Sequence, residues 1–132
     1  MMKSLLRSLK PVRYRSAVHC VSAAFPGATF VIRRMSLGRR IELAHSIRDL
    51  AQELEFHQAG ESVQDQVEAA TLSARIDRVY LEWGLVTVSG LVLDGGPPTA
   101  SALYTIGPEA LLREIIDRIK SECGLSDDER KN

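Results

Sequence analysis

Two short segments near the start of the chain have the residue pattern of β-strands. Apolar and polar side chains alternate in part from Tyr14 to Val21, and the segment 28–32 is rich in β-branched and aromatic residues. Phe25-Pro26-Gly27, which lies between them, is typical of a turn. The pattern therefore predicts a β-hairpin, or two short strands, within residues 12–34.

The next segment, from Leu37 to about Gln58, repeats apolar residues at the spacing of an amphipathic helix. Ser36 precedes it as a candidate N-cap, and Gly60 follows it as a candidate left-handed C-cap. We expect this helix to bury a broad apolar face. The positions assigned to that face are Leu37, Ile41, Ala44, Ile47, Ala51 and Leu54, widened by Leu43 and Leu50.

A second helical segment follows over residues 62–83, with Gly84 at its end. Ser62 is a candidate N-cap, and Asp65 would lie in the first turn, near the positive end of the helix dipole. Because only about three residues separate the two helices, we expect an antiparallel helical hairpin. The apolar stripe assigned to the second helix comprises Val63, Val67, Ala70, Ala74, Ile76, Val79, Tyr80 and Trp83.

The last third of the chain predicts a strand, a turn and a helix. Residues 85–93 alternate loosely as a strand, and residues 94–98, Asp-Gly-Gly-Pro-Pro, form a strong turn signal. Thr99 is a candidate cap for a short helical turn ending at Leu103 or Tyr104. The final helix is expected over 108–123, with proline at its first helical position and Gly124 after its end. Its apolar stripe comprises Leu111, Leu112, Ile115, Ile116, Ile119 and Cys123.

These elements together predict one α+β domain: N-terminal strands, an antiparallel helical hairpin, a further short strand and a C-terminal helix. The length of 132 residues fits a single domain, and no apolar run is long enough to cross a membrane. We expect a basic N-terminal arm at 1–12, the domain at 13–124 and a C-terminal tail at 125–132. The first 27 residues are basic and contain no acid, as in a mitochondrial presequence, but a basic arm leading into a strand is the favoured interpretation.

The formal net charge of zero conceals two oppositely charged halves. Residues 1–50 contain ten Lys and Arg and two acids, whereas residues 51–132 contain seven Lys and Arg and fifteen acids. We expect the basic half to pair with the acidic half, in the same molecule or in a neighbouring copy. Four arginines around the start of the first long helix, Arg33, Arg34, Arg39 and Arg40, are the candidate partner-binding residues. They could also grip phosphates, but a sequence pI of 6.8 makes nucleic acid an unlikely partner.

No pattern in the sequence indicates catalysis, a cofactor or a metal site. His45 and His57 are three helical turns apart, too far to share a metal ion. Phosphate-loop, zinc-protease and nucleophile-elbow motifs do not occur. Cys20 and Cys123 have no metal-binding spacing, and we expect two free thiols rather than a disulfide. The sequence therefore predicts a protein that is not an enzyme.

The segment from Arg33 to Asn132, about three-quarters of the chain, resembles the tail assembly chaperones of long-tailed bacteriophages. The stretches that carry the resemblance are Arg33–Ser36 (RRMS), Gly38–Leu43 (GRRIEL), Tyr80–Leu85 (YLEWGL), Ser89–Leu91 (SGL), Asp94–Gly95, Pro98–Thr99, Gly107–Glu109 (GPE) and Gly124–Asn132 (GLSDDERKN).

The resemblance implies a protein that works in the cytoplasm of the bacterial host and is not part of the mature virion. Chaperones of this family bind the long helical tape measure protein, keep it soluble and help tail-tube subunits polymerise around it. The expected partners are therefore the tape measure protein, the tail-tube protein and further copies of the chain itself. The three amphipathic helices could supply apolar surface for a client, or they could simply form the core of the domain.

Two other functions remain open. A structural virion protein, such as a small tail or head–tail connector subunit, would be found in purified particles, from which a chaperone is absent. A small DNA-binding regulator would use the four arginines, and its binding would weaken steeply with salt.

Overall fold

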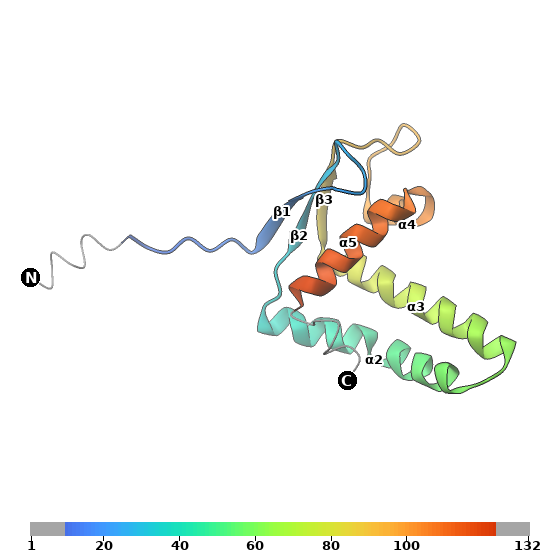
Figure 1. The fold of residues 1–132 in the computed structure, drawn as a ribbon. Helices are drawn as coiled ribbons and strands as arrows, with labels where there is room; N and C mark the ends of the chain where they lie inside the picture. Colours follow the sequence, from blue (N-terminus) through green and yellow to red (C-terminus); the bar gives the residue numbers. More distant parts are fainter. Residues whose placement is uncertain (1–9, 124–132) are drawn as a thin grey trace, which may run out of the picture.

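The computed structural model describes residues 10–123, which form an α+β domain with a three-stranded antiparallel sheet and four helices (Figure 1). The predicted fold class is confirmed. Residues 1–9, Gly124 and the tail at 125–132 lie outside the described residues, so the predictions made for them stay predictions. Within the described residues, none of the helices is long and apolar enough to span a membrane.

The sheet has the order β1-β2-β3, with the strands Ala17–Val21, Thr29–Arg33 and Leu85–Ser89. The central strand pairs antiparallel with both neighbours: Val18 lies opposite Ile32, and Phe30 lies opposite Val88. Phe30 and Ile32 are buried, so one face of the central strand carries the core. The third strand thus extends the N-terminal hairpin, although about fifty residues, most of them helical, separate them in the chain.

The third strand is shorter than predicted and ends at Ser89 instead of Leu93. The physical reason is Gly90, which has a φ of +78° and lies so close to the Gly27 carbonyl that a side chain would collide with it. Leu93 instead bridges to Gly96 across a tight turn in which Asp94 also has a positive φ. The expected turn signal is therefore confirmed, but it belongs to a separate small loop.

The C-terminal helix α5, Glu109–Glu122, packs on the central strand and on α3, and supplies much of the core. Leu111, Ile115, Ile116 and Ile119 are buried, as the predicted stripe requires. The helix begins one residue later than predicted, because Pro108 has an extended ψ of 124° and is the N-cap.

The helices α2, Leu37–Ala59, and α3, Val63–Gly84, form the predicted antiparallel hairpin (Figure 1). Both predicted N-caps are confirmed: the Ser36 hydroxyl accepts a hydrogen bond from the Arg39 N–H, and the Ser62 hydroxyl accepts one from the Asp65 N–H. The prediction of a left-handed cap at Gly60 was wrong. Its φ is −79°, and its extended backbone leads directly into the next cap.

The predicted buried faces of the hairpin are confirmed only in part: Leu43 and Tyr80, both assigned to them, are buried. In α2 only Leu43 is buried, while Leu37 and Ile41 are exposed. In α3 the buried side chains include Leu72 and Leu81, which were outside the predicted stripe. The hairpin extends well beyond the sheet and α5 (Figure 1), so its outer half can bury only the seam between the two helices. The apolar stripes are therefore wider than the surface available to cover them.

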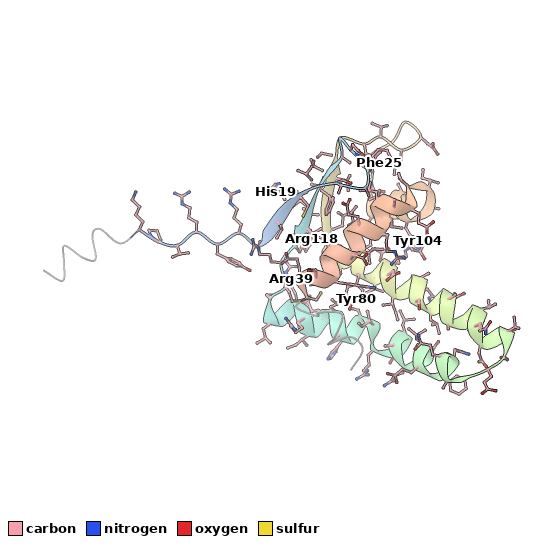
Figure 2. All side chains as sticks on the ribbon, in the orientation of Figure 1. His19, Phe25, Arg39, Tyr80, Tyr104 and Arg118 are labelled. Carbon is pink, nitrogen blue, oxygen red and sulfur yellow. The ribbon has the colours of Figure 1, made fainter. Side chains whose placement is uncertain are left out.

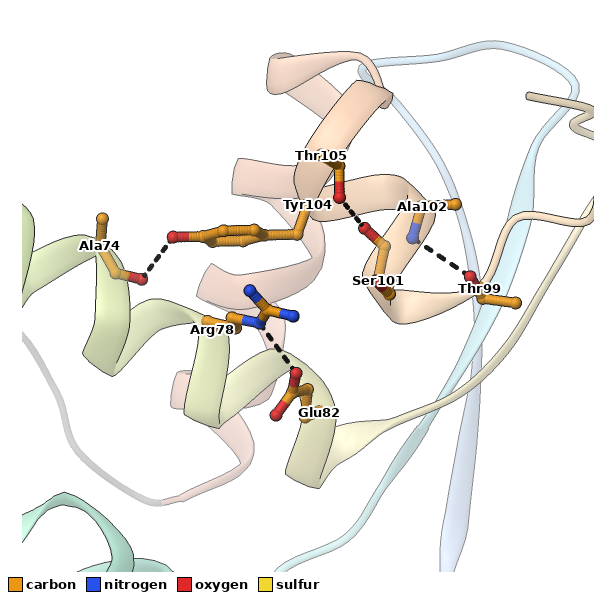
Figure 3. Close-up of polar contacts among 8 residues, drawn as sticks. All are labelled: Ala74, Arg78, Glu82, Thr99, Ser101, Ala102, Tyr104 and Thr105. Carbon is orange, nitrogen blue, oxygen red and sulfur yellow. Dashed lines mark hydrogen bonds and ion pairs between the residues drawn. The ribbon is translucent and has the colours of Figure 1, made fainter. Parts of the chain in front are cut away.

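The inner half of α3 is fastened to the last two helices by polar contacts. Asp77 accepts hydrogen bonds from Arg113 at 3.0 Å and from Lys120 at 2.8 Å, both on α5. On the other side, the Tyr104 hydroxyl donates to the Ala74 carbonyl at 3.4 Å, and the Arg78 guanidinium lies over the Tyr104 ring (Figure 3). These contacts fix the base of the hairpin against the domain.

The short helix α4, Ala100–Ile106, carries Tyr104 and is capped as predicted. The Thr99 hydroxyl accepts a hydrogen bond of 3.1 Å from the Ala102 N–H (Figure 3). The helix is slightly longer than the predicted turn and ends before Gly107, whose N–H donates to the Leu103 carbonyl.

Candidate interaction surface

The four predicted arginines lie on consecutive parts of the chain where β2 passes into α2. Arg33 is the last residue of β2, and the Arg34 N–H donates to the Ser16 carbonyl at 2.8 Å. Arg39 and Arg40 lie in the first turn of α2, which the Ser36 cap begins. Figure 2 shows Arg39 near the start of α2, at the opposite end of the hairpin from the α2–α3 loop.

Two of the arginines lie against aromatic rings. The Arg39 guanidinium carbon is 5.9 Å from the centre of the Trp83 ring, and that of Arg34 is 5.8 Å from the centre of the Tyr14 ring. Such cation–π contacts contribute about 0.5–1 kcal/mol at exposed sites. Trp83 is partly buried and packs against the core, as expected, so its ring is held in place beneath the Arg39 guanidinium.

None of the four arginines forms an ion pair with an acid of the described chain. The basic side chains that do pair with acids there are Arg48, His57, Arg78, Arg113 and Lys120. The expected pairing of the basic half with the acidic half therefore does not occur at the arginines within the domain. Their positive charge remains available at the surface.

Apolar side chains lie beside these arginines. Leu37 is 77% exposed and Ile41 is 52% exposed. With Ala44 they follow the i, i+4, i+7 spacing, which places all three on one face of α2. We name the four arginines together with Leu37, Ile41 and Ala44 the α2 N-terminal surface. Sequence reasoning found its arginines but missed its apolar part, because the helical stripe was assigned to the core.

An apolar groove of about 140 Å³ continues this surface towards α3 and the end of α5. Arg40 and Ala44 line it from α2, and Tyr80 lines it from α3. The remaining lining residues are Met35, Leu43, Ile47 and Cys123. The arrangement provides an apolar binding groove, next to positive charge, for a helical or extended segment.

A second, larger groove of about 620 Å³ lies between β1 and α5 and contains Cys20, Glu114 and Arg118. Burial raises the pKa of the Cys20 thiol, and the nearby Arg118 offsets only part of that shift. The thiol is therefore protonated at neutral pH, which makes it a poor nucleophile. The Glu114 carboxylate accepts hydrogen bonds from the Ser22 hydroxyl and from the N–H groups of Ala23 and Ala24. The Glu114 carboxylate therefore stabilises the β1–β2 turn through these hydrogen bonds.

The described residues contain no cluster of three or more His, Cys, Asp or Glu side chains that could hold a metal ion. Cys20 is half-buried and Cys123 is buried, and the two are not joined by a disulfide. No family model matches the sequence, and comparisons with curated proteins and with solved structures give no match.

Proposed function

We propose that the protein is a non-enzymatic tail assembly chaperone of a long-tailed bacteriophage. It binds the tape measure protein in the cytoplasm of the host, keeps that protein soluble and assists assembly of the tail tube, without remaining in the virion. The resemblance described above suggests the class of client. The observation that carries the proposal is the α2 N-terminal surface, where exposed apolar side chains lie among arginines that have no acidic partner in the described domain.

The chemistry of this surface suits a long amphipathic helix with acidic residues along the edge of its apolar face. Leu37, Ile41 and the adjoining groove would cover apolar side chains of the client, which otherwise drive aggregation. Arg34 and Arg40 would attract carboxylates at the edge and speed the encounter. Binding should therefore bury apolar surface and give a negative heat-capacity change in calorimetry.

Co-expression with the tape measure protein of the same phage tests the proposal. We expect the client to be soluble with the wild-type chain and to aggregate with the variant Leu37→Ser, Ile41→Ser. The matched control is Val92→Ser, Ile106→Ser, because Val92 is 70% and Ile106 is 52% exposed on another part of the domain. This control should keep the client soluble. A client that is equally soluble without the protein, with no complex after gel filtration or crosslinking, would refute the proposal.

Association kinetics test the role assigned to charge. Reversal of Arg39 and Arg40 to Glu should slow client association more than it speeds dissociation, and added salt should shrink the difference from wild type. Mass spectrometry of purified particles supplies a further check. If the protein is abundant in the mature virion, the structural-subunit alternative replaces the chaperone.

A further inference from the structure

The segment of residues 10–16 leads out of β1 as an extended arm that lies away from the sheet and helices (Figure 1). It alternates basic and apolar residues: Lys10, Arg13 and Arg15 are exposed, Val12 is 96% exposed, and Tyr14 is 71% exposed. None of the three basic side chains forms an ion pair within residues 10–123. The Arg34 guanidinium lies over the Tyr14 ring, but the domain leaves most of the surface of Val12 and Tyr14 uncovered. The arm thus presents both positive charge and apolar surface.

The outer end of the helical hairpin has the opposite charge. We name residues 49–68 the hairpin tip; this segment contains six acids and neither Lys nor Arg. Asp65 accepts hydrogen bonds from Ser62 and is paired with His57, and Asp49 lies near Arg48. The other four acids form no ion pair within the described part of the chain; they are Glu53, Glu55, Glu61 and Glu68.

The hairpin tip also exposes apolar side chains. Phe56 is 72% exposed, Val63 is 75% exposed and Val67 is 56% exposed. Val63 and Val67 are four residues apart and share one face of α3. The tip therefore combines the two properties of the arm, apolar surface and charge, with the sign of the charge reversed.

The arginines of the arm cannot reach the tip of their own molecule. Ser16 is hydrogen-bonded to Arg34, close to the start of α2, whereas Glu53 and Glu61 lie roughly 24–36 Å further along the hairpin at about 1.5 Å per helical residue. Arg13 is only three residues before Ser16, a span of at most about 11 Å. Figure 1 shows the arm extending from the side of the domain opposite the α2–α3 loop.

We propose that the arm of one copy docks on the hairpin tip of a second copy of this chain. The arginines of the arm pair with the unpaired glutamates of the tip, and Val12 and Tyr14 cover Val63 and Val67. Because arm and tip are separate surfaces, the contact joins copies reciprocally in a dimer or head-to-tail in a larger assembly. The proposal concerns self-association alone and is independent of the client surface at the start of α2.

Charge reversal on each side separately tests the contact in the full chain, with mass measured by light scattering after gel filtration. Wild type should form particles heavier than one chain at low ionic strength and dissociate as salt is added. Reversal of the arm, Arg13→Glu with Arg15→Glu, should weaken self-association at least about tenfold. Reversal of the tip, Glu53→Lys with Glu61→Lys, should do the same. All four residues are at the surface, and circular dichroism should show unchanged helix content.

The decisive experiment uses an equimolar mixture of the two reversed variants. The mixture should associate again, because the acidic arm of one variant meets the basic tip of the other, and the unchanged arm and tip also match. The control is Glu42→Lys with Asp117→Lys, two exposed acids outside the tip, which should associate as wild type does.

Four results would overturn the proposal. Two are monomers where association is expected: a wild-type chain that is monomeric at low ionic strength, or a mixture of reversed variants that stays monomeric. The third is a control variant that dissociates as fully as the tip variant. The fourth is an arm reversal that abolishes binding to a short DNA duplex while self-association persists. The last result would assign the arm to nucleic acid.

Discussion

The Ser22 hydroxyl donates a hydrogen bond of 2.6 Å to the Glu114 carboxylate, although 92 residues separate the two in the chain. The same carboxylate accepts hydrogen bonds from the backbone N–H groups of Ala23, at 2.8 Å, and Ala24, at 3.3 Å. The Ser22 oxygen in turn accepts the N–H of Phe25. A single side chain of α5 therefore fixes the turn between β1 and β2.

This arrangement predicts an acid-sensitive contribution to stability. Burial raises the pKa of Glu114, but the hydrogen bonds from Ser22, Ala23 and Ala24 together lower it by more. The pKa of Glu114 in the folded protein therefore lies below the ordinary value of 4.5. A carboxyl whose pKa is lowered in the folded state stabilises the fold above its unfolded pKa, and that contribution is lost as pH falls through the folded pKa.

We expect Glu114→Gln to lower the free energy of unfolding by about 1–3 kcal/mol at neutral pH, because charged hydrogen bonds are lost. The difference from wild type should begin to shrink as the pH falls through the unfolded pKa of about 4.5, and it should be smallest below the lowered folded pKa, where wild-type Glu114 is protonated as well. Urea unfolding over a pH series measures both effects. Asp117→Asn, an exposed carboxyl on the same helix, is the control. A constant difference at every pH would contradict the role given to the charge.

The same substitution, glycine to alanine, should have opposite effects at Gly84, which packs against α5, and at Gly38, which lies in the open first turn of α2. At Gly84, which is buried, an added Cβ would lie 2.6 Å from Cγ2 of Ile119, so Gly84→Ala should cost about 1–3 kcal/mol through overpacking. At Gly38 an added Cβ meets nothing within 4 Å, so Gly38→Ala should stabilise α2 by about 0.5–1 kcal/mol. Equilibrium unfolding in urea compares the two. Equal stability of Gly84→Ala and wild type would contradict a close contact between Gly84 and Ile119.

The two thiols should react in a fixed order. Thiol titration under denaturing, non-reducing conditions should count two free groups. In the folded protein Cys20 should react slowly at neutral pH, because burial raises its pKa, and faster as pH rises, while the buried Cys123 should react more slowly still. Cys20→Ser should remove the faster phase. Loss of the slower phase in that variant would reverse the assignment.

Features that depend on neighbouring residues in the chain could be predicted from the sequence. The caps at Ser36, Ser62 and Thr99 were predicted because a hydroxyl before a helix bonds an N–H two or three residues later, whatever surrounds it. The apolar stripe of α5 was predicted because that helix is covered by both the sheet and α3, so the whole stripe is buried.

Features that depend on distant residues could not be predicted in the same way. Periodicity shows that Leu37 and Ile41 share a face, but not whether another element covers it. The burial of Leu72 and Leu81 reflects where α3 meets its neighbours, which their spacing alone does not reveal. For the same reason the arginines of the candidate surface could be named from the sequence, while their lack of acidic partners in the described domain required the structure.

The projection of the hairpin has a consequence for local unfolding. The connected core cluster of the described chain includes α2 side chains as far as Ile47 and α3 side chains from Ile76 onward, and the buried Leu72 lies outside this cluster. The outer helical turns are therefore held mainly by each other, and they should open without melting the sheet. In hydrogen exchange, backbone amides near the α2–α3 loop should exchange through these partial openings. Amides of β2 and α5 should exchange only when the whole domain unfolds.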